Sequence, residues 1–471
     1  MRKTKMVCTV GPASESNEIL TKIIEAGMNA SRHNFSHGDH EEHRGRMVKV
    51  RELSAKLGKE VAILLDTKGP EIRTGKFEPN KLELTMGDKF TVYAGEEVIG
   101  DTTKCSVTYA GLANDVKAGN IILIDDGLVG LEVESVEGNK VHCVVKNTGI
   151  VGTHKGVNVP GVSIKLPAMT DKDRSDLVFG CEMKVNLVAA SFIRKAEDVI
   201  AIREVLKANG GEDIQIFSKI ENQEGVDNID SIIEVSDGIM VARGDLGVEI
   251  PMEEVPSAQK MMIRKCKEAG KPVITATQML DSMIRNPRPT RAEVSDIANA
   301  IFDGTDAIML SGESANGSWP VEAVETMSKI AVTAERDLAY EVSTSDAKNH
   351  TPAISGVISR AACNAAAELD ATAIISATKS GATASRLSQC RPVSPIIAVT
   401  PSERVAKKLA LKYGVFAIVA DEMKSTDEIM TRTVELSKEN GYVKAGDTVV
   451  IAAGVANEVG STDLLKVSVV K

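Results

Sequence analysis

Short apolar segments that alternate with amphipathic stretches are the feature that most constrains the fold of this chain. Three of these segments precede residue 70, and five more follow Pro167. Apolar runs joined by stretches of helical periodicity are typical of parallel β-strands connected by helices. Eight such units predict a TIM (β/α)8 barrel. The expected strands span residues 5–10, 28–35, 61–66, 185–192, 214–220, 238–243, 272–277 and 307–311.

The pattern changes twice along the chain. Residues 76–168 contain short alternating segments such as K-F-T-V-Y and K-V-H-C-V-V, separated by Gly, Asn and Asp turns. That pattern is typical of a small all-β barrel or sandwich inserted into the α/β domain. From about residue 346 the βα alternation returns, which predicts a separate, smaller α/β domain. The expected domains are a discontinuous catalytic barrel of residues 1–70 and 168–345, an inserted β-barrel lid of 71–167 and a C-terminal α/β regulatory domain of 346–471.

Composition excludes several classes of protein. The formal net charge is −10, and the chain has only five Tyr, eight Phe and one Trp, so nucleic-acid binding is not expected. The seven cysteines form no CxxC pair, which argues against a zinc ribbon or a disulfide framework. The N-terminus lacks the apolar core of a signal peptide, and no apolar run is long enough to span a membrane. We therefore expect a cytoplasmic protein.

Charged side chains follow most of the predicted strands at their carboxyl ends, where the active residues of TIM barrels lie. Lys219 and Glu221 are two residues apart, so they face the same side of one strand. Glu221 and Asp245 offer two hard oxygen ligands from neighbouring strands, which suits Mg²⁺ or Mn²⁺. The full set at these ends is Arg32, Asn34, Ser36, Asp66, Thr67, Lys68, Arg73, Lys219, Glu221, Arg243, Gly244, Asp245, Thr277 and Ser311.

Each of these groups also has a purely structural interpretation. Arg243 and Asp245 could form a structural ion pair, and Lys219 could be a buried lysine paired with Glu221. Charged residues at so many successive strand ends nevertheless favour one charged pocket. A metal site, a lysine and the arginines Arg32 and Arg73 around one centre are the components of phosphoryl transfer.

Long segments of the sequence closely resemble the signatures of the pyruvate kinase family. They are T-V-G-P-A-S, N-F-S-H-G, L-L-D-T-K-G-P-E-I-R-T-G, S-K-I-E-N-Q-E-G, M-V-A-R-G-D-L-G-V-E-I, I-T-A-T-Q-M-L-D-S-M and D-G-T-D-A-I-M-L-S-G-E-S-A. The order of barrel, inserted β domain and C-terminal α/β domain agrees with that family. The resemblance implies the last step of glycolysis, in which phosphoenolpyruvate and ADP give pyruvate and ATP.

The resemblance also implies a role for each strand-end residue. Lys219 would stabilise the phosphoryl group in flight, and Glu221 and Asp245 would bind the divalent ion. Thr277 would lie beside the enolate carbon, and Ser311 would help to carry a proton through water. The implied substrate contacts are Arg32, Lys219, Gly244, Asp245 and Thr277, and Arg73 joins Arg32 in phosphate binding. The implied nucleotide contacts are Asn34, His37, Arg73 and Lys172. The implied K⁺ ligands are Asn34, Ser36, Asp66 and Thr67.

Glu71 sharpens the expectation of a monovalent cation. In the family, a glutamate in G-P-E-I-R accompanies dependence on K⁺, and a lysine there accompanies independence. The physical reason is charge balance, because an acidic neighbour makes a bound cation favourable. We therefore expect activation by K⁺.

The C-terminal domain carries T-K-S-G-A-T at residues 378–383, between a predicted strand and a helix. Backbone N–H groups and hydroxyls there could bind a phosphate, although an ordinary capped turn fits the same residues. The family binds a phosphorylated effector with this loop and a later one, which matches G-S-T at 460–462. Ala382 replaces a basic residue of some members, so fructose 1,6-bisphosphate, a sugar monophosphate and AMP all remain open. The implied loop residues are Thr378, Lys379, Ser380, Gly381 and Thr383, and the family implies a homotetramer.

Four of the seven histidines lie close together, at His33, His37, His40 and His43. A helical metal pair is not expected, because this stretch reads as a strand that enters a loop. His33 replaces the leucine usual in the family and points away from the pocket, so we expect a destabilising, non-catalytic substitution. His40 and His43 are expected at the start of a solvated helix. Asn316 replaces a lysine of some members, so whether this position contacts the nucleotide stays open.

Two other functions fit the same residues. The chain could be a catalytically silent paralogue that binds phosphorylated metabolites, because a fold does not determine a function. It could also be a TIM-barrel aldolase or lyase that uses Mg²⁺ to hold an enolate. A requirement for ADP separates this last class from a kinase.

Overall fold

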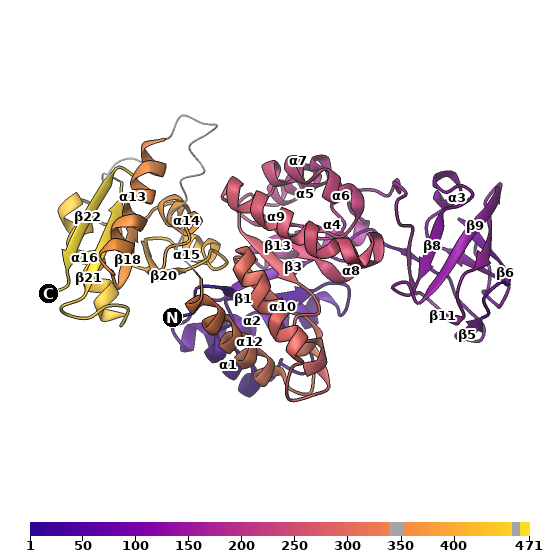
Figure 1. The fold of residues 1–471 in the computed structure, drawn as a ribbon, viewed down its shortest axis with the longest axis horizontal. Helices are drawn as coiled ribbons and strands as arrows, with labels where there is room; N and C mark the ends of the chain where they lie inside the picture. Colours follow the sequence, from indigo (N-terminus) through magenta and orange to yellow (C-terminus); the bar gives the residue numbers. More distant parts are fainter. Residues whose placement is uncertain (339–352, 455–461) are drawn as a thin grey trace.

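The computed structural model describes residues 1–338, 353–454 and 462–471. A closed barrel lies at the centre of the molecule, with an inserted β unit on one side and a C-terminal α/β unit on the other (Figure 1). The predicted fold class is therefore confirmed. No helix in the described part of the chain is long and apolar enough to cross a membrane.

The barrel has eight parallel strands in the order β1-β17-β16-β15-β14-β13-β3-β2. Each predicted strand range contains one of them. The strands are almost entirely buried on both faces, which explains their continuous apolar sequences. Their bounds are β1 Lys5–Thr9, β2 Ala30–Asn34, β3 Ala62–Asp66, β13 Leu187–Ala190, β14 Gln215–Ile220, β15 Gly238–Ala242, β16 Val273–Ala276 and β17 Ala307–Leu310.

The helices around the barrel begin at strong sequence signals. The side chain of Asp39 caps α2 and forms a reciprocal capping box with Glu42. Gly27 ends α1 in the left-handed conformation at φ 115°, which glycine adopts without steric cost. The elements are α1 Asn17–Ala26, α2 His40–Lys56, α4 Asp171–Glu182, α5 Ala196–Ala208, α6 Gln223–Asp227, α7 Ile229–Val235, α8 Arg243–Glu249, η1 Met252–Glu254, α9 Val255–Ala269, η2 Asp281–Ile284, α10 Arg291–Asp303, α11 Gly312–Ala315 and α12 Pro320–Arg336.

The insertion between β3 and β13 forms its own sheets and its own apolar core. A seven-stranded sheet has the order β4-β12-β8-β9-β10-β6-β7, and β11 pairs with β5 in a separate ribbon. The elements are β4 Ile72–Arg73, β5 Lys81–Leu84, β6 Lys89–Ala94, β7 Lys104–Val107, α3 Leu112–Asp115, β8 Ile121–Ile124, β9 Val129–Glu137, β10 Lys140–Val145, β11 Gly149–Gly152 and β12 Gly156–Asn158.

The C-terminal unit is a five-stranded sheet in the order β20-β19-β18-β21-β22, in which only β22 is antiparallel. Apolar clusters pack on both faces of this sheet. Its elements are α13 Ile354–Glu368, β18 Ala373–Ala377, α14 Ala382–Gln389, β19 Ile396–Thr400, α15 Glu403–Lys408, β20 Val415–Val419, α16 Thr426–Glu439, β21 Thr448–Ala453 and β22 Leu464–Val469.

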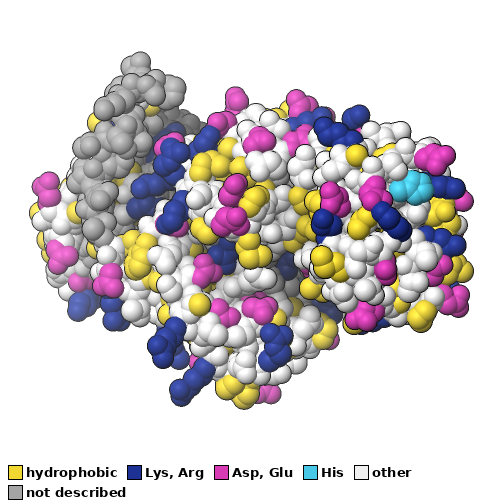
Figure 2. All heavy atoms as spheres, turned by 45° about the vertical axis from the view of Figure 1, so that its right-hand side comes forward, with side chains coloured by type: hydrophobic (Ala, Val, Ile, Leu, Met, Phe, Trp, Pro, Cys, Tyr) yellow, Lys and Arg dark blue, Asp and Glu magenta, His cyan; other side chains and the backbone are white. Residues whose placement is uncertain are grey.

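The C-terminal unit also completes the floor of the barrel. Leu411, which follows α15, is only 1% exposed and belongs to the apolar cluster formed by the inward-facing barrel residues. Beside it, Tyr413 N–H donates to Asp306 of the barrel at 3.3 Å, and Arg391 forms an ion pair with the same aspartate at 3.1 Å. The surface turned forward in Figure 2 shows acidic and basic side chains interspersed.

Candidate active site

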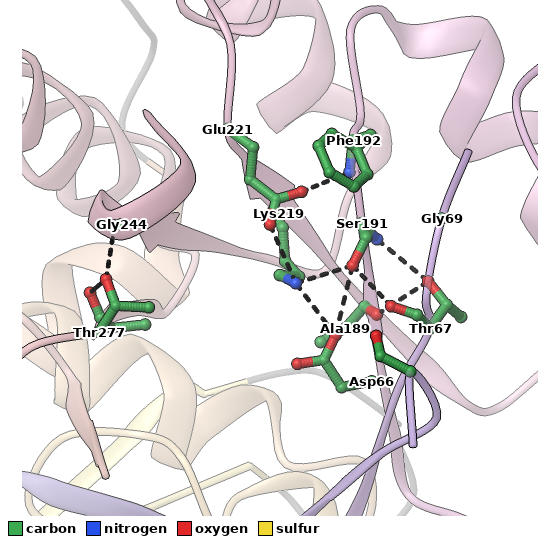
Figure 3. A network of polar contacts seen from close by, with 12 residues as sticks. Asp66, Thr67, Gly69, Ala189, Ser191, Phe192, Lys219, Glu221, Gly244 and Thr277 are labelled. Atoms are coloured by element: carbon green, nitrogen blue, oxygen red, sulfur yellow. Dashed lines mark hydrogen bonds and ion pairs between the residues drawn. The ribbon is translucent and has the colours of Figure 1, made fainter. Parts of the chain in front are cut away.

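Lys219 lies at the centre of a buried polar network at the carboxyl end of the barrel (Figure 3). Its Nζ donates to Ser191 Oγ at 2.7 Å and to Asp66 Oδ1 at 3.2 Å, and it lies 3.0 Å from Glu221 Oε1. Burial lowers the pKa of Lys219, but Asp66, Glu221 and Asp245 outweigh burial and raise it above its ordinary value. The side chain is therefore a permanent ammonium and cannot act as a base near neutral pH.

Glu221 follows β14 directly and is 1% exposed. Its Oε2 accepts the backbone N–H of Phe192 at 2.5 Å, so both carboxylate oxygens have partners. Burial, together with repulsion from Asp245, raises the pKa of Glu221 even though Lys219 opposes the shift. Asp245 lies on α8, which follows the neighbouring strand β15, and it is half-buried. The negative charge of Asp245 thus acts on Glu221 across the ends of the two neighbouring strands.

Arg32 and Asp66 form the second part of the network. Arg32 Nε donates to Asp66 Oδ2 at 2.5 Å, and Arg32 Nη1 donates to Thr9 Oγ1 at 2.9 Å. Asp66 is fully buried, which opposes ionisation, but Arg32 and Lys219 hold its pKa below the ordinary value. Asp66 therefore fixes one arginine and one lysine side by side as a pair of positive charges.

Thr277 has a strained backbone at the end of β16. Its φ is 71°, a left-handed conformation that is rare for a β-branched residue. Thr277 Oγ1 accepts the N–H of Gly244 at 2.7 Å and donates to Ala276 O at 2.6 Å, and Arg243 Nη2 donates to Thr277 O at 2.7 Å. Strain held in place by such contacts is concentrated at functional sites.

Ser311 occupies the equivalent position after β17. Its N–H donates to Glu313 Oε2 at 2.7 Å, and Glu313 Oε1 accepts Leu280 N–H at 3.0 Å. Burial raises the pKa of Glu313. Asn316 ends the short helix α11 and is exposed.

A cavity of about 650 Å³ separates the top of the barrel from the insertion. Arg73 reaches it from β4, in the inserted sheet, and not from the end of a barrel strand. Arg73 Nε donates to Glu71 Oε2 at 2.6 Å, and Arg73 Nη1 donates to His154 O at 2.7 Å. Phe192 and Asp245 also line the cavity, which connects it to the network around Lys219.

The four residues expected to bind K⁺ lie at the ends of β2 and β3. Asn34 and Asp66 are register partners on these two strands. Asn34 Oδ1 accepts Ser36 N–H at 3.1 Å, and Thr67 Oγ1 accepts the N–H of Ser191 at 3.1 Å. The strands thus bring carboxylate, amide and hydroxyl oxygens together, which is the donor chemistry that a hard cation requires.

The histidines are packed more tightly than the sequence indicated. His43 is 2% exposed, and its ring stacks on Phe35 with ring centroids 4.0 Å apart. Its Nε2–H donates to the carbonyl oxygen of His37 at 2.9 Å. His40 Nε2 lies 2.8 Å from Asp176 Oδ1. The expectation of a solvated helix start at His40 and His43 is therefore wrong, because α2 packs against α4.

Two residues expected at the nucleotide lie beside this cluster. His37 is exposed, and its carbonyl is the one bound by His43. Lys172 Nζ donates to Phe35 O at 2.9 Å and to Asp176 Oδ2 at 2.7 Å.

Residues 378–383 span the loop after β18 and the first two residues of α14. Thr378 Oγ1 accepts Gly381 N–H at 2.9 Å, which is the arrangement of a capped turn. Thr383 Oγ1 lies 2.8 Å from Thr462 Oγ1, so this loop meets the later loop expected to join it. Lys379 forms an ion pair with Glu422 at 2.6 Å. Residues 460 and 461 of the later loop, and the domain boundary at 345–346, lie outside the described residues.

Ser191 is the site residue that sequence reasoning missed. It follows β13, accepts from Lys219 and donates to Thr67 O at 2.7 Å. The predicted strand at residues 185–192 includes Ser191, and the expected site residues include none from this strand. The serine in A-A-S-F was the available signal, since the other barrel strands deliver polar residues at the same position.

Comparison with known proteins agrees with this geometry. Residues 1–324 match the family model "Pyruvate kinase, barrel domain", and residues 357–468 match "Pyruvate kinase, alpha/beta domain". The pyruvate kinase of Clostridium acetobutylicum is 66% identical over the full length of both chains. That of Clostridium perfringens is 54% identical over 99% of both. A crystal structure of a pyruvate kinase from Cryptosporidium parvum superposes with a TM-score of 0.95 at 40% identity, covering 100% of this chain and 96% of that one. The chain belongs to the pyruvate kinase family.

Proposed function

We propose that the chain transfers the phosphoryl group of phosphoenolpyruvate to ADP, giving pyruvate and ATP, at the network around Lys219. The observation that carries the proposal is the buried ammonium of Lys219, held between Asp66, Ser191 and Glu221. Full-length identity with curated pyruvate kinases supports this enzyme over a silent metabolite-binding paralogue. We also propose a cytoplasmic location, as befits a glycolytic enzyme.

Lys219 and Arg32 act as fixed positive charges. A transferring phosphoryl group spreads negative charge over its oxygens, and preorganised cations stabilise that charge without reorganisation. The raised pKa of Lys219 keeps it charged throughout the cycle. Arg73 adds a third cation from the inserted sheet, so its approach depends on the position of that sheet over the cavity.

Glu221 and Asp245 suit a divalent ion. Burial and the negative charge of Asp245 raise the pKa of Glu221, and a divalent cation bound by the two carboxylates would offset the repulsion. Within the described residues no three His, Cys, Asp or Glu side chains converge on one point, so substrate and water would supply the other ligands. Glu221 and Asp245 would hold Mg²⁺ or Mn²⁺ there, and the ion would supply positive charge against the charge that develops on the phosphoryl oxygens.

Thr277 and Ser311 serve the step in which a proton is delivered to the enolate carbon. The hydroxyl of Thr277 is fixed between Gly244 and Ala276, so it positions the enolate carbon instead of moving freely. Gly244 lies against Thr277 Oγ1 without a side chain, which leaves room for substrate at this point. Ser311 orients water for delivery of the proton to carbon.

Asn34, Ser36, Asp66 and Thr67 form the proposed K⁺ site. Asp66 belongs to this site and also holds Arg32 and Lys219, so a cation there would be linked directly to the phosphate-binding charges. Glu71 is paired with Arg73 and lies 4.0 Å from Lys68 Nζ. In this proposal Glu71 offsets the charge of these two cations and thereby leaves the monovalent site favourable.

Pyruvate formation tests the central proposal. The full chain is assayed with phosphoenolpyruvate, Mg²⁺ and K⁺, with and without ADP, and pyruvate is followed by coupled reduction to lactate. We expect turnover only with ADP and a fall in kcat of about 10³-fold for Lys219→Met. Lys165→Met, at a side chain that is 81% exposed, is the matched control and leaves the rate unchanged. Turnover without ADP, or an active Lys219→Met enzyme, would contradict the proposal.

The K⁺ proposal has its own assay. Replacing K⁺ by tetramethylammonium at constant ionic strength is expected to lower the rate sharply, and Glu71→Lys is expected to weaken that dependence. Glu83→Lys, at an exposed position of the insertion, is the matched control. Equal rates in the two salts would refute the monovalent site.

The C-terminal unit is the proposed regulatory part. We propose that residues 378–383 bind a phosphorylated effector and that the chain assembles as a homotetramer. Contact between Thr383 and Thr462 supports a composite loop site. Phosphoenolpyruvate saturation curves with fructose 1,6-bisphosphate, a sugar monophosphate or AMP, and sedimentation of the unliganded protein, test these two statements. Curves that no compound changes would contradict an effector site.

A further inference from the structure

Two cysteines lie side by side in the C-terminal unit. Cys363 lies in the middle of α13 and is 1% exposed, whereas Cys390 follows the last turn of α14 and is half-buried. Their side chains are in hydrogen-bonding contact. Independently, Cys363 Sγ donates to Leu387 O at 3.8 Å, and Cys390 Sγ donates to Arg386 O at 3.5 Å. Both sulfurs therefore lie over the same turn of α14.

We propose that Cys363 and Cys390 form a peroxide-sensitive dithiol that closes to an intrachain disulfide. The half-buried position of Cys390 gives an oxidant access, and the contact with Cys363 places a second thiol within reach of the product. The site lies away from the network around Lys219 and is not used in phosphoryl transfer.

The two steps balance with hydrogen peroxide as the oxidant. The thiolate of Cys390 attacks one oxygen of the peroxide, the O–O bond breaks, and a sulfenic acid and hydroxide form. Cys363 Sγ then attacks the sulfur of Cys390, loses its proton and displaces the hydroxyl group as water. Two thiols and one peroxide thus give one disulfide and two waters.

The surroundings distinguish the roles of the two thiols. Hydrogen bonding to Cys390 and burial raise the pKa of the Cys363 thiol, so Cys363 is unreactive until its neighbour is oxidised. A second pair, Cys105 and Cys143, lies in the core of the insertion, but both of its members are 1% exposed. Burial also raises the pKa of both. That pair is a natural control, because peroxide cannot reach it in the folded protein.

The position of the dithiol connects it to two functional parts of the chain. Helix α14, which Cys390 follows, begins directly after the loop at residues 378–381. The next residue, Arg391, donates to Gly304 O and Thr305 O of the barrel. A disulfide would fix α14 to α13 at the point between the loop and this barrel contact.

Peptide mapping of the oxidised full-length chain tests the proposal. The reduced protein is treated with hydrogen peroxide under native conditions, free thiols are blocked with iodoacetamide, and the chain is digested with trypsin. We expect a mass loss of about 2 Da for the intact chain before alkylation and a crosslink between peptides 361–379 and 387–404, reversed by dithiothreitol. Cys363→Ser should leave Cys390 as a sulfenic acid that dimedone traps, and Cys390→Ser should leave Cys363 reduced. Cys105→Ser should form the crosslink as the unmodified chain does.

Three results would overturn the proposal. They are oxidation of Cys390 to a sulfinic acid while Cys363 stays reduced, crosslinks only between chains, or faster oxidation of the Cys105 and Cys143 pair. Since peptide mapping reads the bond directly, a change in activity is not needed to decide.

Discussion

A leucine in place of His33 is expected to stabilise the barrel. His33 lies on β2, is fully buried, and has its Nε2 3.1 Å from Ser31 Oγ. Its Nδ1 has no hydrogen-bond partner. An unpaired buried nitrogen costs about 1–3 kcal/mol, and loss of the contact with Ser31 costs about 0.5–1.5 kcal/mol. Ser31 keeps a donor contact to Ala62 O at 3.4 Å, so the net gain near neutral pH is about 1 kcal/mol.

The gain should grow in acid. Burial, the ring of His43 and three nearby arginines lower the pKa of His33 well below 6.5, so the folded ring stays neutral. Below pH 6.5 the unfolded chain binds a proton at His33 that the folded chain does not. Each further pH unit therefore costs the unmodified protein about 1.4 kcal/mol, until the folded pKa is reached. The leucine variant does not pay this cost.

Melting temperatures at pH 7.5 and pH 5.5 measure both effects. We expect His33→Leu to melt about 2–4 °C higher at pH 7.5 and about 5–10 °C higher at pH 5.5. His142→Leu, at a histidine whose side chain is 36% exposed, is the control and should show no such widening. The Mg²⁺ requirement should be unchanged. The reasoning would be refuted if His33→Leu and the unmodified protein melted at the same temperature, or if the difference between their melting temperatures became smaller in acid.

Three further perturbations address other parts of the chain. Burial lowers the pKa of Lys5 to about 7, so between pH 7 and pH 10.5 only the unfolded chain binds a proton there, and stability should rise with pH. In melting experiments Lys5→Met should remove this rise, whereas Lys329→Met, at an exposed lysine, should keep it. Ser191→Ala should lower kcat about 10–100-fold with a smaller change in KM, because Lys219 loses its hydrogen-bond partner at 2.7 Å. Steady-state kinetics measure both constants, and an unchanged kcat would contradict this role of Ser191. Leu411→Ala should destabilise the barrel by about 2–5 kcal/mol in urea unfolding, whereas an effect confined to the C-terminal unit would contradict its place in the barrel core.

Local patterns explain why the barrel could be predicted. Its strands are apolar on both faces, and the helices between them carry capping residues such as Asp39 and Thr290, so each unit is recognisable on its own. Parallel closure then brings all the carboxyl ends to one face, which is why Lys219 and Glu221 could be placed together before any contact was known.

The remaining features depend on contacts between distant segments. His43 is buried because its ring stacks on Phe35, and His40 is held by Asp176 on α4. Nothing within the helix itself indicates either contact. Strands β20 and β22 lie at the two edges of the C-terminal sheet, and β22 lacks the continuous apolar run of the central strands. Ser191 accepts a hydrogen bond from Lys219, and that contact joins two different strands, so the sequence around Ser191 does not indicate it.

Leu411 has a consequence for how the chain is made. The residue that fills the floor of the barrel is translated about 75 residues after α12 ends, which is about 4–15 s later at 5–20 residues per second. During that interval the barrel has all its strands but an uncovered apolar floor. The barrel is synthesised first, but its apolar floor is covered only when the C-terminal unit docks. A message truncated before residue 411 would yield an open barrel for chaperones and proteases to recognise, which couples the survival of the catalytic part to complete synthesis of the regulatory part.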